Sequence, residues 1–414
     1  MQPELIKTKI CIIGAGPSGA TASIFLGKMG IQHLIVDAAD FPRDKICGDG
    51  IDLNAVRVLN HIDPMIVNTE LADTSIFTAS AGMRFILPNR KQVDIERGFK
   101  KPATGLEQLP VFYVGKRSDF DNLLVSKIDP KLADLRLQTR IIQINREGKT
   151  WKLKGKTPTG FLDIEADFLI GADGDHSIML NYLGERKIDR KNYAGAVRQY
   201  WQGISGLHQL NLIEVYFPRR LPLSYFWIFP LPNGEANVGY GMTSHYISKN
   251  NINVRKVFEE LIKTDPHLKE RFINATPMEA ARGWGVPMSG SQRKAHGEGW
   301  LLVGDAASIV CPSSGEGIGS GMISSYIATK FIERAIREND LSDLMFANYE
   351  REIHKRLKNS ERFFRLINFL PARCFPFLIN LIFSNRFVRN GIANNAIHQW
   401  IETAYTKEIM VNLD

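Results

Sequence analysis

The sequence predicts an α/β protein in which a Rossmann-like nucleotide-binding domain carries an inserted antiparallel β-sheet domain and is followed by a C-terminal helical segment. Three observations predict this fold class: an apolar strand that runs into a glycine-rich turn near residue 14, alternating large aromatic residues between 222 and 230, and a basic, apolar tail. A chain of 414 residues with 44% hydrophobic content can bury the cores of two or three domains.

The first unit of the chain reads as strand, turn, helix and strand. Its turn follows the apolar stretch 10–13 in G-x-G-x-x-G spacing and consists of Gly14, Ala15, Gly16, Pro17, Ser18 and Gly19. The first glycine makes a tight turn, the second lets the backbone approach a pyrophosphate, and the third lets helix and strand pack closely. Asp37, followed by Ala38, ends the second strand and can bind a ribose hydroxyl. The unit predicts a dinucleotide site without distinguishing FAD from NAD.

Two later stretches favour FAD. Residues 166–177, "ADFLIGADGDHS", predict a buried strand that ends at Asp173, and residues 299–336 predict a strand, Gly304-Asp305, a loop and a long helix. The second stretch resembles the "GDAA...P..GEG" segment of p-hydroxybenzoate hydroxylase-like flavoproteins. The resemblance implies that Asp305 holds the ribityl chain, and that the flavin's pyrimidine edge meets the helix start at Gly315, Gly317 and Ile318. A helix N-terminus stabilises the negative charge that reduced flavin carries there.

Three further motifs refine the resemblance. "VGKRSDFDNLLV" (114–125) resembles the same family's arginine-containing helix start, which implies that Arg117 lies near the cofactor. "KICGDG" (45–50) and "YFWIFP" (225–230) resemble the C-G-x-G and Y-x-W-x-F-P motifs of geranylgeranyl reductases. The resemblance covers roughly residues 8–345 and adds the loop Cys47, Gly48, Asp49 and Gly50 to the cofactor site. Asp49, and Ser308 in "GDAAS", stand where glycine occurs in relatives, so the substrate stays open.

The resemblance implies an FAD-dependent reductase that saturates C=C bonds of an isoprenoid or other polyene chain, such as a geranylgeranyl lipid or a menaquinone side chain. Hydride would come from N5 of the reduced flavin, and a proton from Cys47, Tyr225 or water. Tyr225, Trp227 and Phe229 alternate along a predicted strand and therefore share one face. We expect these three residues, here called the aromatic wall, to lie beside the flavin, joined by Trp201 and Trp284. Cys47 and the aromatic wall are the predicted catalytic residues; ordinary core packing is the alternative for the wall.

The motifs divide the chain into three parts. We expect residues 1–70, 100–190 and 280–345 to form the FAD domain, residues 71–99 and 191–279 the sheet domain that holds the substrate, and residues 346–414 a helical tail. The resemblance also brings Cys47 and Cys311 to the flavin. A disulfide between them is one hypothesis, and two free thiols, which we favour, is the other.

The net charge of +8 (52 basic minus 44 acidic residues) comes almost entirely from residues 351–389, which hold nine Lys or Arg against Glu352 and Glu361. Because these charges alternate with large apolar residues, they favour an anionic membrane surface or a packed helical subdomain over nucleic acid. We expect a cytoplasmic protein, peripheral to the inner face of the membrane, without a signal peptide or a metal site.

Other functions and partners stay open. The chain has one G-x-G-x-x-G unit, so we expect electrons from a transient NAD(P)H or from ferredoxin. An FAD monooxygenase or halogenase-like enzyme acting on an apolar substrate is the first alternative, although a halogenase is expected to show W-x-W-x-I-P, and residues 225 and 229 are Tyr and Phe. A non-catalytic flavin- or lipid-binding protein is the second. The oligomeric state is not determined by the sequence.

Overall fold

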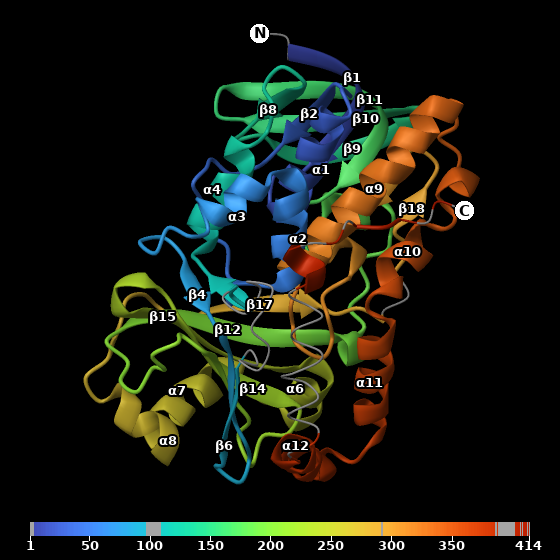
Figure 1. Ribbon diagram of the computed structural model, residues 1–414. Coiled ribbons are helices and arrows are strands. Elements are labelled where there is room, and N and C mark those ends of the chain that lie inside the picture. The colour runs from blue at the N-terminus through green and yellow to red at the C-terminus, as the bar shows by residue number, and fades with distance from the viewer. Residues whose placement is uncertain are drawn as a thin grey trace.

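The computed structural model describes residues 4–96, 109–290 and 293–385, together with residues 387, 402–405, 407, 409–411 and 413. Its two large sheets lie one above the other in Figure 1, with helices around the upper sheet and the tail helices along one side. The predicted fold class is confirmed: a parallel-sheet domain carries a second, mostly antiparallel sheet and is followed by helices.

The first sheet is built around β1, whose second half is entirely buried. From one edge to the other its strands are β18 (His296–Gly297), β19 (Trp300–Leu302), β11 (Gly160–Gly171), β1 (Glu4–Ile13), β2 (His33–Val36) and β8 (Ala133–Arg136). All neighbours except β18 and β19 run parallel, and the hairpin of β9 (Arg140–Glu147) and β10 (Thr150–Thr157) is attached to β11. The parallel strands therefore end together near Ile13, Val36, Gly171 and Leu302, and ligands of such sheets bind beyond this carboxyl edge.

The helices of this domain pack around β1 and its neighbours. They are α1 (Pro17–Lys28), α2 (Leu53–Ile62), α3 (Pro64–Asn68), α4 (Arg117–Ser126), α5 (Ile178–Tyr182) and α9 (Ile318–Glu338). The long helix α9 contacts α1 and α2 and carries small buried residues on that face. A small sheet of β3 (Gly50–Ile51), β7 (Phe112–Val114) and β4 (Thr78–Ser80) connects this domain to the second sheet.

Most residues in the central strands of the second sheet are buried, because both faces of this sheet are covered. Its strands are, in order, β16 (Thr276–Pro277), β12 (Tyr193–Gln202), β15 (Glu235–Thr243), β14 (Ser224–Pro230), β13 (Ile213–Tyr216), β5 (Gly82–Ile86) and β6 (Gln92–Glu96), with β17 (Arg282–Pro287) beside β12. Only β13 and β5 pair in parallel. Strand β17 thus carries the sheet past the expected boundary at residue 280. One face packs on α7 (Val254–Thr264) and α8 (Pro266–Lys269), with α6 (Ser244–Asn250) at its edge.

The tail forms α10 (Tyr349–Lys355), α11 (Lys358–Phe369) and α12 (Phe375–Ser384). Single 3₁₀ turns occur at Arg190–Asn192, Pro232–Gly234, Glu270–Phe272, Gly304–Ala307, Asp343–Phe346 and Ala372–Cys374. Among the described residues, no helix alone has the length and apolar character needed to cross a membrane. Residues of α11 and α12 meet that requirement only together, and they are bent by 112°.

Candidate active site

The glycine turn after β1 is closed on one side and open on the other. Gly14 has a φ of +103°, and a Cβ there would lie 2.5 Å from the Ala172 carbonyl oxygen. A Cβ at Gly19 would lie 1.8 Å from the Gly14 oxygen, so only glycine lets α1 start here. At Gly16, the nearest atom to a Cβ is the flexible end of Arg43, at 3.3 Å. The open side of the turn thus faces a cation, as a pyrophosphate site requires.

Asp37 is held at the same turn. Its Oδ2 accepts a hydrogen bond from the Ala15 amide at 2.7 Å, and its Oδ1 accepts one from the Ala39 amide at 2.8 Å, across Ala38. Each carboxylate oxygen can accept a second hydrogen bond. The structure therefore places Asp37 beside the glycine turn, and its bond to a ribose stays a prediction.

A buried group of charges lies next to Gly16. Arg117, the first residue of α4, donates two hydrogen bonds to Asp121 at 2.6 and 2.7 Å, and Arg43 Nη1 lies 3.0 Å from the same carboxylate. Burial lowers the pKa of Arg117, but Asp121 outweighs burial, and Cys47 adds a further hydrogen bond, so the pKa is raised. Arg43 Nη1 is buried without a hydrogen bond. Two cations share one anion, which leaves positive charge for a phosphate.

The FAD motifs at Asp173 and Gly304 meet at the carboxyl edge. Asp173 Oδ2 accepts a hydrogen bond from the Ile178 amide at 2.7 Å, whereas Oδ1 is buried without a partner. Burial raises the pKa of Asp173 to about 6. Ser18 fills the space above two glycines: a Cβ would lie 2.4 Å from its Oγ at Gly304 and 2.5 Å at Gly321. The glycine turn, the Gly304 turn and α9 are therefore in direct contact.

The start of α9 lies beside Asp305 and Tyr225. A Cβ at Gly317, the N-cap, would lie 3.5 Å from Asp305 Oδ1, and Ile318 begins the helix. Gly315 has a φ of +79°, and a Cβ there would lie 2.6 Å from the Tyr225 hydroxyl. That hydroxyl donates to the Ser314 carbonyl at 3.0 Å. The structure thus joins the predicted flavin segment to the aromatic wall.

The aromatic wall faces the loop Cys47–Gly50. Trp227 is 6% exposed and lies flat over Gly239, where a Cβ would be 2.1 Å from the indole. In the loop, a Cβ at Gly48 or at Gly50 would lie 3.5 Å from the Phe229 ring. The wall therefore covers the loop, with the glycines of both segments providing room for the rings.

Asp49 is the centre of a buried hydrogen-bond network that sequence reasoning missed. Its Oδ2 accepts from the Tyr200 hydroxyl at 2.6 Å and from Asn237 Nδ2 at 2.8 Å, while Oδ1 is buried without a partner. Asn237 also donates to the Cys47 carbonyl at 2.8 Å and accepts from Trp227 Nε1 at 2.9 Å. Burial, against these hydrogen bonds, raises the pKa of Asp49 to about 7. Asn237 thereby fixes the loop and the aromatic wall to each other.

The two predicted additions to the wall have different outcomes. The strand register pairs Ala196 with Trp284 and with Gly241, and Gly241 with Tyr225, so Trp284 lies on the wall's face. Its ring packs 3.9 Å from Lys45 Nζ, and burial lowers the pKa of that lysine. Trp201 instead points to the opposite face and packs against Phe272, because it pairs with Ala236, in register with Pro230. The prediction for Trp201 was wrong.

All four cysteines are free, including Cys47 and Cys311, so the disulfide between them is not formed in this structure. Cys47 lies at Arg117, and Cys311 Sγ lies 3.1 Å from Ser360 Oγ of α11. The favoured reading, two free thiols, matches the structure.

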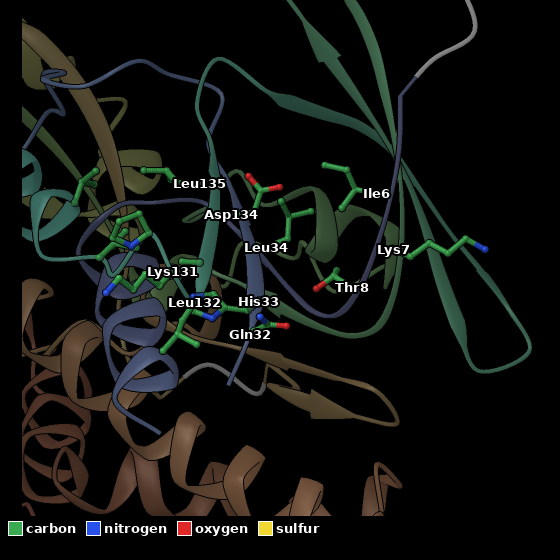
Figure 2. Close-up of a pocket in the computed structure, with 14 residues that line it drawn as sticks. Ile6, Lys7, Thr8, Gln32, His33, Leu34, Lys131, Leu132, Asp134 and Leu135 are labelled. Carbon is green, nitrogen blue, oxygen red and sulfur yellow. The ribbon is translucent and has the colours of Figure 1, made fainter. Parts of the chain in front are cut away.

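A hollow of about 590 Å³ lies away from this site. Figure 2 shows it around the amino-terminal parts of β1, β2 and β8, with Thr8, His33 and Asp134 among its lining residues. It lies at the opposite edge of the first sheet from the glycine turn and is open to solvent.

The fold and the site together define a flavoprotein. Residues 7–363 match the family model described as "FAD binding domain", and the chain belongs to this family. The glycine turn, the spare positive charge at Arg43 and the unpartnered Asp173 oxygen suit FAD, which is therefore the cofactor.

The relatives sharpen this class. The chain is 27% identical over 354 residues to a digeranylgeranylglycerophospholipid reductase from Thermoplasma acidophilum, which covers 84% of each chain. It is 26% identical over 334 residues to a menaquinone reductase from Mycolicibacterium smegmatis, covering 79% of this chain and 76% of the relative. The motif-based resemblance to geranylgeranyl reductases is confirmed by these relatives.

Solved structures support the fold. A geranylgeranyl bacteriochlorophyll reductase-like protein from Thermoplasma acidophilum superimposes with a TM-score of 0.79 at 22% identity, covering 98% of both chains. The flavin-dependent brominase Bmp2 follows with a TM-score of 0.72 at 17% identity, covering 97% of this chain and 94% of the other. At these identities the likeness concerns the fold alone, which reductases and halogenases share.

Proposed function

We propose that the protein is an FAD-dependent reductase that saturates C=C bonds in the isoprenoid chain of a lipid or quinone. The observation that carries this proposal is the aromatic wall: three large rings, placed against the Cys47–Gly50 loop and the start of α9, give an apolar surface next to the flavin segment. An apolar surface of tilted aromatic rings suits a polyprenyl chain, and the reductase relatives act on substrates of this kind by name.

Bound FAD, once reduced, supplies the hydride for this reaction. The chain's own residues then have to exclude water, hold the alkene and deliver a proton. The aromatic wall excludes water, and its ring faces stabilise positive charge that develops on the alkene during protonation. Burial raises the pKa of Tyr225, with Glu316 adding to the effect, so its hydroxyl keeps its proton over the working pH range.

We propose two groups as candidate sources of the proton. Tyr225 donates to Ser314 at the flavin segment, and the Cys47 thiol lies at Arg117. We propose that one of these two residues donates the proton and that the other supports it. Electrons would reach the flavin from NAD(P)H or ferredoxin. The remaining predicted cofactor residues keep the roles stated above: phosphate contacts at the glycine turn, ribose at Asp37 and ribityl at Asp305.

The test is anaerobic. The flavoprotein is reduced with dithionite, and a geranylgeranyl lipid or menaquinone in detergent is added while the flavin absorbance is followed and products are weighed by mass spectrometry. We expect reoxidation with a gain of two hydrogens per bond reduced. Reoxidation only after air is admitted, with one oxygen atom in the product, would replace the proposal by a monooxygenase. Absence of any substrate-dependent reoxidation would leave a binding protein.

Two variants test the donor in the same assay. Tyr225→Phe and Cys47→Ser are each compared with Cys374→Ser, which changes a thiol in the tail. Loss of a proton donor costs about 10²–10⁴-fold in rate. We expect that loss in one of the two variants, with bound flavin unchanged, and none in the control. Equal rates in all three would assign the proton to water.

A further inference from the structure

The tail helices α11 and α12 form a bent pair with an apolar outer surface, here called the elbow (residues 358–384). In Figure 1, α11 runs along the side of the second sheet and α12 turns beneath it. The elbow bends by 112°, and α11 contains no buried residue. Its exposed large side chains, with their exposed fractions, are Phe363 (43%), Leu366 (62%), Phe369 (81%), Leu370 (37%), Phe377 (67%) and Leu381 (57%). This is too much apolar surface, too close together, for an ordinary solvated face.

The elbow also carries exposed cations. Lys358, Arg362, Arg365 and Arg373 are all exposed. Arg365 acts electrostatically on Glu361, where it helps to lower the pKa of that carboxyl. Glu361, the one acid of the elbow, is hydrogen-bonded to His354 and Ser289. The elbow therefore carries four cations against one engaged anion, mixed with Phe and Leu. A basic amphipathic surface of this kind lies in the headgroup region of an anionic bilayer.

The inner face of α12 continues into the active site. Phe383 packs 4.4 Å from Phe85 of β5, and Phe375 packs 6.2 Å from Phe217, between ring centroids. These rings and Ile379 belong to the same apolar cluster as Tyr225 and Phe229 of the aromatic wall. An unbroken series of packed apolar side chains, here called the apolar path, thus links the elbow to the wall.

We propose that the elbow docks on an anionic lipid bilayer and that the apolar path under α12 is the access route by which a membrane-held polyprenyl chain reaches the aromatic wall. The second half of this proposal rests on the proposed function, whereas the docking does not. A bilayer fits better than a second copy or a soluble partner, because the elbow combines cations with exposed Phe and Leu side chains.

Docking is tested by flotation of the flavoprotein with vesicles of phosphatidylcholine, alone or with phosphatidylglycerol. We expect flotation that needs the anionic lipid and falls at high salt. Phe377→Asp/Leu381→Asp and Arg362→Glu/Arg365→Glu should each weaken binding at least about tenfold. Matched controls are Leu344→Asp, which changes an apolar side chain that is 83% exposed and lies outside the elbow, and Lys249→Glu/Lys263→Glu, two exposed lysines of the second sheet domain. Wild type that never floats, or variants that change the oligomeric mass and not flotation, would overturn the proposal in favour of a protein partner.

The access route is tested by turnover and by labelling. The same variants should lose turnover of a geranylgeranyl lipid embedded in vesicles and keep turnover of geranylgeraniol in detergent. Equal loss on both substrates would contradict the route. A geranylgeranyl chain carrying a diazirine should label peptides 217–229 and 375–383, and labelling confined to other segments would also contradict it. If neither substrate turns over in wild type, the proposed function fails, while flotation still decides the docking.

Discussion

The two faces of strand β14 use aromatic residues in opposite ways. On one face, Phe226 is fully buried, stacks on Phe258 at 5.6 Å and meets Phe272 edge-on. On the other face, Trp227 and Tyr225 each donate a hydrogen bond, to Asn237 and to the Ser314 carbonyl. Packing fixes the Phe226 ring, whereas hydrogen bonds orient Trp227 and Tyr225. The difference marks the second face as the one where orientation matters.

The largest effect should come from the face of β14 that carries Phe226, here called the packing face. Phe226→Ala leaves a cavity where the ring contacted Phe258, and such truncations cost about 3–5 kcal/mol of unfolding free energy. We expect this loss in urea titrations, with flavin content and turnover unchanged wherever the protein is still folded. Phe226→Leu, which keeps most of the volume, should cost less than half as much. A drop in turnover of folded Phe226→Ala would show that the two faces are not independent.

Much of the cofactor edge could be predicted because its signals are local. Gly14, Gly19 and Asp37 lie within one strand–turn–helix–strand unit, where spacing along the chain fixes spacing in space. Arg43 and Asp121 could not be found in this way, because they meet across segments that are far apart in sequence. Their pattern, a lone arginine and an acid inside a helix, is common on ordinary surfaces.

The aromatic face shows the same limit more sharply. Alternation predicts that Tyr225, Trp227 and Phe229 share a face, but not which face, and the motif resemblance was needed to choose. Trp201 lies on a different strand, and one residue of register moves a side chain to the opposite face. Asn237 and Tyr200 reach Asp49 only through that register. Pairing between strands is a long-range property that a single sequence does not display.

The face of β14 that carries Tyr225 and Trp227, here called the orienting face, can be disturbed without substituting an aromatic residue. At Gly239 a Cβ would lie 2.1 Å from the Trp227 ring, so Gly239→Ala must displace the indole and break its bond to Asn237. Overpacking of this kind costs about 1–3 kcal/mol. We expect that loss of stability, turnover reduced about tenfold or more, which corresponds to about 1.4 kcal/mol, and unchanged flavin content.

Gly283→Ala is the matched control for this change. Gly283 lies in β17 of the same sheet, and its Cβ would meet only the Ala196 carbonyl, at an ordinary 3.7 Å. Its turnover should equal that of wild type. Equal turnover in Gly239→Ala would mean that the orientation of Trp227 is not needed, and the contrast between the two faces would lose its functional meaning.

The smallest effect concerns the acid that holds the orienting face in place. Burial raises the pKa of Asp49 to about 7, whereas an exposed aspartate in the unfolded chain titrates near 3.8. Between these values the folded protein binds more protons than the unfolded chain, so this group's contribution to stability is complete below pH 3.8 and is lost as the pH rises toward 7. Asp49→Asn mimics the protonated acid and keeps an acceptor for Tyr200 and Asn237.

We therefore expect the unfolding free energy of Asp49→Asn, relative to wild type, to rise between pH 5 and pH 7 by on the order of 1 kcal/mol. Urea titrations across this range measure it. Asp52, Asp173 and Glu316 have raised pKa values of about 6, 6 and 8, and they impose the same sign of pH dependence on both proteins, so only the difference between the two proteins reports on Asp49. A difference that stays flat would mean that Asp49 is ionised throughout, held by Arg198 and Arg117. The network would then orient Trp227 through a charge, and Asp49→Asn would weaken it at every pH.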